Sequence, residues 1–91
     1  MPGVALAVEL AGQGIRVNAV CPGPIDTPML NAEFAFAAQP LEARLEEIAL
    51  VPLGRLGAPS DIAAVVAFLA SDAAKFVTGA AWSVDGGKTA R

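Results

Sequence analysis

The chain has 91 residues and a net charge of −3, and 55% of its residues are hydrophobic against 16% that are charged. An acidic chain with scattered lysines and arginines offers no basic patch, which excludes a nucleic-acid partner. The sequence contains no histidine and no tyrosine, so the commonest general base and any tyrosine acid are excluded from its own catalysts.

The hydrophobic content is higher than the about 45–50% of an average soluble domain. It indicates either a membrane role or a surface that further protein covers. The longest apolar run, residues 62–70, falls well short of the roughly 20 residues that a membrane-spanning helix needs. The N-terminal stretch lacks the basic segment of a signal peptide and contains Glu9. We therefore expect no membrane partner, and the lone Cys21, which cannot form an internal disulfide, fits the reducing cytoplasm.

The first predicted element is a helix over residues 2–12, because apolar side chains recur there at helical spacing on one face. Gly14 follows it, and glycine readily takes the left-handed conformation found after a helix. Residues 15–21 predict a strand that is covered on both faces, since the run is apolar and rich in β-branched residues. Arg16 and Asn18 interrupt this run lightly, as is typical near a strand end.

A proline-glycine turn follows at residues 22–24. The next region, residues 29–56, has a less regular pattern. Pro40 can open a short helix within it, because proline is tolerated in the first turn of a helix. Residues 51–57 read as a loop.

The clearest helix is predicted over residues 59–74, where a broad apolar stripe runs along one face. Pro59 suits its first position, and Asp61 places negative charge near the positive end of the helix dipole. A second strand is predicted over residues 80–84, and it is closed by an Asp-Gly-Gly turn.

The order is thus helix, strand, helical excursion, helix, strand, within one domain over residues 1–91. Strands joined through a helix are normally parallel neighbours with a right-handed crossover, so the fold class is α/β. Two parallel strands do not make a stable sheet alone. We therefore expect a fragment of a larger sheet, with Met1 falling inside a helix, and the missing layers account for the apolar excess.

Three blocks of sequence carry a resemblance: "ALAVELAGQGIRVNAVCPGPIDTPM" at residues 5–29, "PLGRLGAPSDIAAVVAFLASDAAKFVTG" at residues 52–79 and "VDGG" at residues 84–87. In this order and spacing they resemble the C-terminal part of the short-chain dehydrogenase/reductase family. The resemblance implies a C-terminal fragment of a Rossmann-type doubly wound parallel sheet. It also implies hydride transfer between NAD or NADP and a small alcohol or carbonyl substrate, and a homo-oligomer.

The resemblance places a nicotinamide-facing turn after the first strand, with cofactor-binding residues Pro22, Gly23, Ile25 and Thr27. Backbone groups of Ile25 would bind the carboxamide of the nicotinamide, and the hydroxyl of Thr27 would reach the carboxamide or the neighbouring phosphate. Gly23 would let the backbone approach the ring. The alternative is purely structural: the prolines and glycine form a simple turn, and Thr27 is the N-cap of a helix that starts at Pro28. Thr27 can also serve both roles.

Residues 28–57 resemble the lid segment that covers the substrate in this family, with Met29, Leu30 and Phe34, beside Phe36, as candidate lid residues. Other polar residues have structural interpretations, in which Arg55 ties down a loop and Asp85 belongs to a closing turn.

The family's catalytic serine, tyrosine and lysine have no counterpart here, so we predict that these 91 residues alone are inactive. The alternative to a truncated enzyme is an oligomerisation or interaction module, because residues 62–69 form an apolar helix face beside a sheet edge. A non-functional fragment is the third possibility. The sequence names neither the substrate nor the choice between NAD and NADP.

Overall fold

The computed structural model describes residues 2–90. These residues form two strands and four α-helices, in the order α1 (Pro2–Leu10), β1 (Ala19–Pro22), α2 (Pro28–Phe36), α3 (Pro40–Ala49), α4 (Pro59–Ala70) and β2 (Ala81–Val84). Short 3₁₀ turns follow α1 at Ala11–Gln13 and α4 at Asp72–Ala74.

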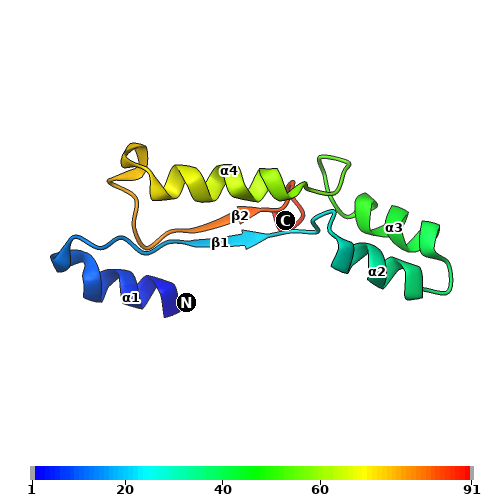
Figure 1. The fold of residues 1–91 in the computed structure, drawn as a ribbon, viewed down its shortest axis with the longest axis horizontal. Coiled ribbons are helices and arrows are strands. Elements are labelled where there is room, and N and C mark those ends of the chain that lie inside the picture. The colour runs from blue at the N-terminus through cyan, green and yellow to red at the C-terminus, as the bar shows by residue number, and fades with distance from the viewer. Residues whose placement is uncertain (1, 91) are drawn as a thin grey trace.

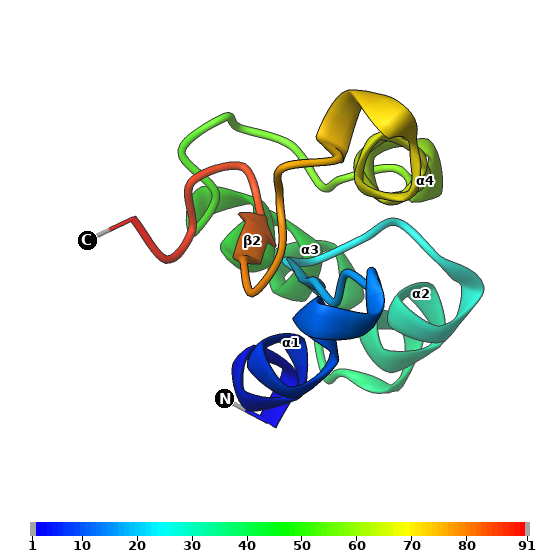
Figure 2. The same cartoon turned by 90° about the vertical axis from the view of Figure 1, so that its left-hand side faces the viewer.

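The two strands pair in parallel, with Ala19 opposite Ala81 and Pro22 opposite Val84. Helix α4 lies along one face of this ribbon, and α1 lies on the other (Figure 1). The end-on view in Figure 2 shows the same three layers. The predicted α/β class, the parallel pairing and the crossover through α4 are therefore confirmed.

The first strand is shorter than predicted, because pairing starts only at Ala19. Before it, one backbone bond, from Gly79 N–H to Val17 O at 2.8 Å, and several side-chain bonds join the two segments. Val17 N–H donates to the Thr78 hydroxyl at 3.1 Å, and Asn18 donates to Val77 O at 3.0 Å while accepting from Ala80 N–H at 3.1 Å. The sequence pattern marked an extended segment correctly but could not tell ladder bonds from these side-chain bonds.

Helix α4 begins at Pro59, as predicted, but ends at Ala70 instead of continuing to residue 74. Ser71 leaves the helix with extended backbone (φ −91°, ψ 166°), and its N–H and hydroxyl both donate to Phe68 O, at 3.0 and 2.6 Å. At the start of the helix, Asp61 Oδ2 accepts from Ala58 N–H at 2.7 Å. The serine thus terminates a helix whose apolar pattern alone would continue.

The largest departure from the sequence prediction is α2, which occupies part of the region expected to be irregular. Thr27 Oγ1 accepts from Leu30 N–H at 3.2 Å, and Pro28 takes the first helical position. The N-cap interpretation of Thr27 is therefore confirmed. Helix α3 starts at Pro40, as predicted. The two helices form a hairpin beyond the end of the strands, which we call the arm, residues 28–49 (Figure 1).

The core is small: the buried apolar residues are Ala7, Val51, Leu56, Leu69 and Ala74. Large side chains such as Phe36 and Phe76 are 92% and 101% exposed. The Cα radius of gyration is 16.2 Å, whereas a compact domain of this length has about 12 Å. The apolar excess therefore lies largely on the surface, where further protein can cover it. Among residues 2–90, no helix has the length and hydropathy needed to cross a bilayer.

Candidate functional site

The carboxyl ends of β1 and β2 meet at one edge of the sheet, which is where open α/β sheets bind ligands. Gly23 continues β1, and its N–H donates to Val84 O at 3.0 Å. A β-carbon at Gly23 would lie 2.6 Å from Asp85 Cβ and 2.7 Å from Asp85 Cα. Gly23 therefore permits a close approach of Asp85 at the end of β2, and the approach of its backbone to a nicotinamide ring stays a prediction.

Ile25 lies in an isolated parallel bridge with Gly57. Gly57 N–H donates to Pro24 O at 2.9 Å, and Asp26 N–H donates to Gly57 O at 2.7 Å. In such a bridge the N–H and C=O of the central residue point away from the partner. Among residues 2–90 neither backbone group of Ile25 makes a hydrogen bond, although the residue is half-buried. The turn therefore presents one donor and one acceptor side by side.

Thr27 lies two residues further on, at the start of α2. Its hydroxyl oxygen already accepts from Leu30 N–H. A hydroxyl also has one proton to donate, so the N-cap bond leaves its donor available. The structural role and a ligand-binding role at Thr27 are compatible.

A cavity of about 330 Å³ lies at the strand ends. Its walls come from the strand ends and turn, from the arm and from the C-terminal segment: Cys21, Pro22, Gly23, Pro24, Leu30, Glu47, Ser83, Asp85, Lys88 and Thr89. Of the residues predicted from the sequence, Pro22, Gly23 and Leu30 meet in this wall. Ile25, Thr27, Met29 and Phe34 do not line it.

The sequence prediction missed Glu47 and Lys88, whose side chains form an ion pair of 2.8 Å in the cavity wall. No motif marks these positions, and 41 residues separate them along the chain. Only the folded arrangement brings α3 next to the C-terminal segment.

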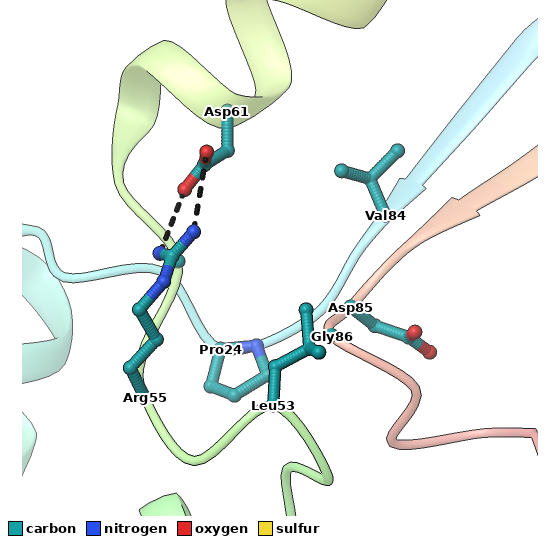
Figure 3. Close-up of a pocket in the computed structure, with 8 residues that line it drawn as sticks. Pro24, Leu53, Arg55, Asp61, Val84, Asp85 and Gly86 are labelled. Atoms are coloured by element: carbon teal, nitrogen blue, oxygen red, sulfur yellow. Dashed lines mark hydrogen bonds and ion pairs between the residues drawn. The ribbon is translucent and has the colours of Figure 1, made fainter.

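A second cavity of about 170 Å³ shares Pro24 and Asp85 with the first (Figure 3). Arg55 and Asp61 approach each other in its wall, with 3.0 Å between Nη1 and Oδ2, and Arg55 also donates to Leu56 O at 3.0 Å. The expected loop-tying role of Arg55 is confirmed. The hydrogen bond from Arg55, followed by that from Ala58 N–H, lowers the pKa of Asp61 below its usual value.

Asp85 organises the turn after β2. Its carboxylate accepts from the Thr89 hydroxyl and N–H and from Gly87 N–H, and the first of these bonds contributes most to lowering the pKa of Asp85. The structural interpretation of the Asp-Gly-Gly motif is therefore confirmed. Within residues 2–90, no group of three or more Cys, Asp or Glu side chains has the arrangement of a metal site.

Three comparisons bear on this geometry. A family model described as enoyl-(acyl carrier protein) reductase matches residues 4–89. The chain is 46% identical over 85 residues to 2-(S)-hydroxypropyl-CoM dehydrogenase 3 of Xanthobacter autotrophicus. The aligned region covers 93% of this chain and 33% of that protein. The chain thus spans about a third of the length of the curated relatives it matches.

Two solved structures match with a TM-score of 0.91. One is a short-chain dehydrogenase family protein of Francisella tularensis, 40% identical, matched over 98% of this chain and 39% of that one. The other is YwfH, an NADPH-dependent reductase of bacilysin biosynthesis, 29% identical, matched over 99% of this chain and 36% of that one. The sequence blocks, the parallel strand pair and these matches agree, and the chain belongs to the short-chain dehydrogenase/reductase family.

Proposed function

We propose that this chain contributes the nicotinamide-facing half of the cofactor site of an NAD- or NADP-dependent oxidoreductase. The observation that carries the proposal is the backbone of Ile25, whose free N–H and C=O lie at the carboxyl edge of the parallel sheet. A carboxamide has an acceptor oxygen and a donor NH₂ group, so the residue fits it with one bond of each kind. The bridge to Gly57 holds this pair of groups in place.

The remaining predicted cofactor residues act around Ile25. Pro22 and Gly23 bring the turn to the end of the sheet, and the Thr27 hydroxyl has a proton to donate to the carboxamide oxygen or to the neighbouring phosphate. The nicotinamide, when bound, supplies or accepts the hydride. This chain's residues orient the ring and bring no proton donor of their own to the substrate, since the sequence contains no tyrosine. On this proposal the isolated chain is inactive.

The arm takes the role of the substrate lid. Leu30 faces the 330 Å³ cavity beside the turn, while Met29 and Phe34 belong to the same helix. Apolar lid side chains exclude water from a reacting alcohol or carbonyl. They fit many substrates, so the proposed substrate class stays at the level of an alcohol or carbonyl compound. The single cysteine supports a cytoplasmic location.

A chimaera tests the cofactor assignment. Residues 4–89 replace the matching third of the Xanthobacter dehydrogenase, whose remaining two thirds supply the rest of the domain. We expect oxidation of 2-(S)-hydroxypropyl-CoM with NAD⁺ or NADP⁺, measured by absorbance, and none from the isolated chain. Turnover by the isolated chain would overturn the predicted inactivity.

Three substitutions in the chimaera separate the two roles of Thr27. Thr27→Ser keeps the N-cap and the donor, Thr27→Asp keeps only the N-cap, and Thr27→Val loses both. We expect KM for the cofactor to rise about tenfold or more in the Asp and Val variants and to change little in the Ser variant. Equal KM values for Ser and Asp would contradict a cofactor contact at Thr27.

A second candidate function is self-association, favoured by the apolar surface along α4 and β2. Phe68 and Trp82 stack with their ring centroids 5.8 Å apart, yet stay 40% and 36% exposed, and Phe76 is fully exposed. Exposed aromatic side chains beside a strand edge are typical of an interface. Light scattering coupled to size exclusion tests it, and a stable folded monomer at micromolar concentration would contradict it.

A further inference from the structure

The C-terminal turn, residues 85–90, packs directly against the segment that follows the arm. Leu53 N–H donates to Gly86 O at 3.1 Å. A β-carbon at Gly86 would lie 2.5 Å from Val51 Cγ1, and one at Gly87 would lie 3.1 Å from Pro52 Cγ. The side chains of Val51 and Pro52 therefore pack directly on the two glycines and leave no room for further side chains there. The end of the chain forms a wall for the base of the arm.

Lys88 extends this contact onto the arm itself. Its Nζ lies 2.8 Å from Glu47 Oε1 on α3, and the two side chains are 34% and 28% exposed. The other two ion pairs found among residues 2–90, Arg55–Asp61 and Arg44–Asp26, are longer and more exposed. Less water surrounds the Lys88–Glu47 pair, so its electrostatic attraction is screened least.

The arm has little else to hold it. Neither α2 nor α3 contains a buried residue. Its root is tied by a polar cluster in which Asn31 donates to Asp26 at 2.8 Å and Arg44 donates to Asn31 at 2.9 Å. At the same base, the C-terminal turn holds Glu47 near the end of α3. With so little buried apolar area, these polar contacts at the base decide where the arm lies.

We propose that Lys88 and Glu47 form a clasp that fixes α3 against the C-terminal turn and so sets the position of the arm beside the strand ends. Lys88 is thus a positioning residue for the arm. The pair lies in the wall of the 330 Å³ cavity, so opening it widens this cavity. The clasp does not depend on the cofactor assignment and can be tested without it.

Hydrogen–deuterium exchange of the purified chain, read by mass spectrometry, tests the clasp. Lys88→Met keeps the aliphatic stem and removes the charge. We expect amide exchange in α3 to rise about two- to fivefold, with exchange in β1 unchanged. Lys88→Arg restores the protection. Lys75→Met is the matched control, because Lys75 is exposed and belongs to none of the ion pairs among residues 2–90.

Two further measurements exclude a general loss of structure. At about 1 M salt the Debye length falls to about 3 Å, so the difference between parent and Lys88→Met is expected to shrink. Lys88→Met could also raise exchange in β1. In that case the charge-swapped protein with Glu47→Lys and Lys88→Glu distinguishes the clasp from a general loss of structure. Restored protection in α3 of this protein supports the clasp. Unchanged exchange of α3 in Lys88→Met, no restoration by the swap, or a parent chain without protection in α3 would each overturn the proposal.

Discussion

The polar groups at the two ends of the parallel strand pair differ in whether they are hydrogen-bonded within the described residues 2–90. At the amino ends, the Arg16 guanidinium donates to Leu69 O, Val77 O and Ser71 O at 2.8, 3.1 and 3.3 Å, and Asn18 bridges Val77 and Ala80. At the carboxyl ends, the backbone of Ile25 makes no hydrogen bond within the described residues 2–90.

This difference separates polar groups that hold the fold from polar groups that are available to a ligand. At the amino ends, Arg16 and Asn18 are bonded to backbone groups of the same chain. Arg16 binds carbonyls at the end of α4, so its cation also suits the negative end of the helix dipole. At the carboxyl ends, the backbone bonds of Gly57 to Pro24 and Asp26 fix the geometry of the turn. They leave the N–H and C=O of Ile25 free. An unpaired backbone group in a half-buried place costs free energy, which a bound ligand can offset.

The largest expected loss of stability comes from a substitution at the amino ends of the two strands. Arg16→Met keeps much of the side-chain volume but removes every bond to the three carbonyls at the end of α4 and after it. Val77 O keeps its bond from Asn18 and Ser71 O its bond from Ala74 N–H. The loss of the bonds from the charged guanidinium is nevertheless expected to lower the free energy of unfolding by about 2–3 kcal/mol. Urea denaturation followed by the fluorescence of Trp82 on β2 measures this loss. Lys75→Met serves as the control, and a loss below about 0.5 kcal/mol would show that water replaces the guanidinium.

Next in size is a change that disturbs the carboxyl end by steric overlap, without removing a polar group. Gly23→Ala places a β-carbon 2.6 Å from Asp85 Cβ, so the ends of β1 and β2 must separate. Overpacking of this kind costs about 2 kcal/mol. Gly12→Ala is the matched control, because a β-carbon there meets no atom within 4 Å. Equal free energies of unfolding for the two variants would mean that the strand ends separate without a loss of stability.

Thr27→Val sharpens the comparison at the start of the arm. The hydroxyl accepts from Leu30 N–H, and loss of an N-cap costs about 1 kcal/mol. Thr27→Asp retains the acceptor and is expected to keep the stability of the parent. Exchange of the amides in α2 measures the effect. Equal exchange in the Val and Asp variants would argue against the N-cap bond.

Sequence reasoning reached the fold class, the parallel strand pair, and the starts of α3 and α4, because periodicity and proline positions act locally. It missed the early end of α4, since Ser71 terminates the helix through its own hydroxyl and not through glycine or proline. For α2 it offered the start at Pro28 under a Thr27 cap only as an alternative, because the pattern of residues 28–36 is weak, and it did not predict the extent of the helix. At the candidate site, the close contact between Gly23 and Asp85 could not be predicted, because 62 residues separate the two along the chain.

The smallest effect concerns the ion pair between Arg55 and Asp61. This pair holds the loop that carries Gly57, and Gly57 in turn holds Ile25 through the backbone bridge. The pKa of Asp61 is lowered in the folded state, mainly by the hydrogen bond from Arg55, so its carboxylate stabilises the fold above its ordinary pKa of 3.8. That contribution is lost as the pH falls below 3.8 and through the lower folded value.

Asp61→Asn keeps an oxygen for Ala58 N–H but removes the charge. Its stability is therefore expected to fall below that of the parent at neutral pH and to approach it as the pH falls below 3.8. Urea denaturation from pH 7 to pH 3 measures the difference. A difference that is constant across this range would show that the charge of Asp61 contributes nothing, and that the Ala58 N–H bond alone holds the loop at the carboxyl end of the sheet.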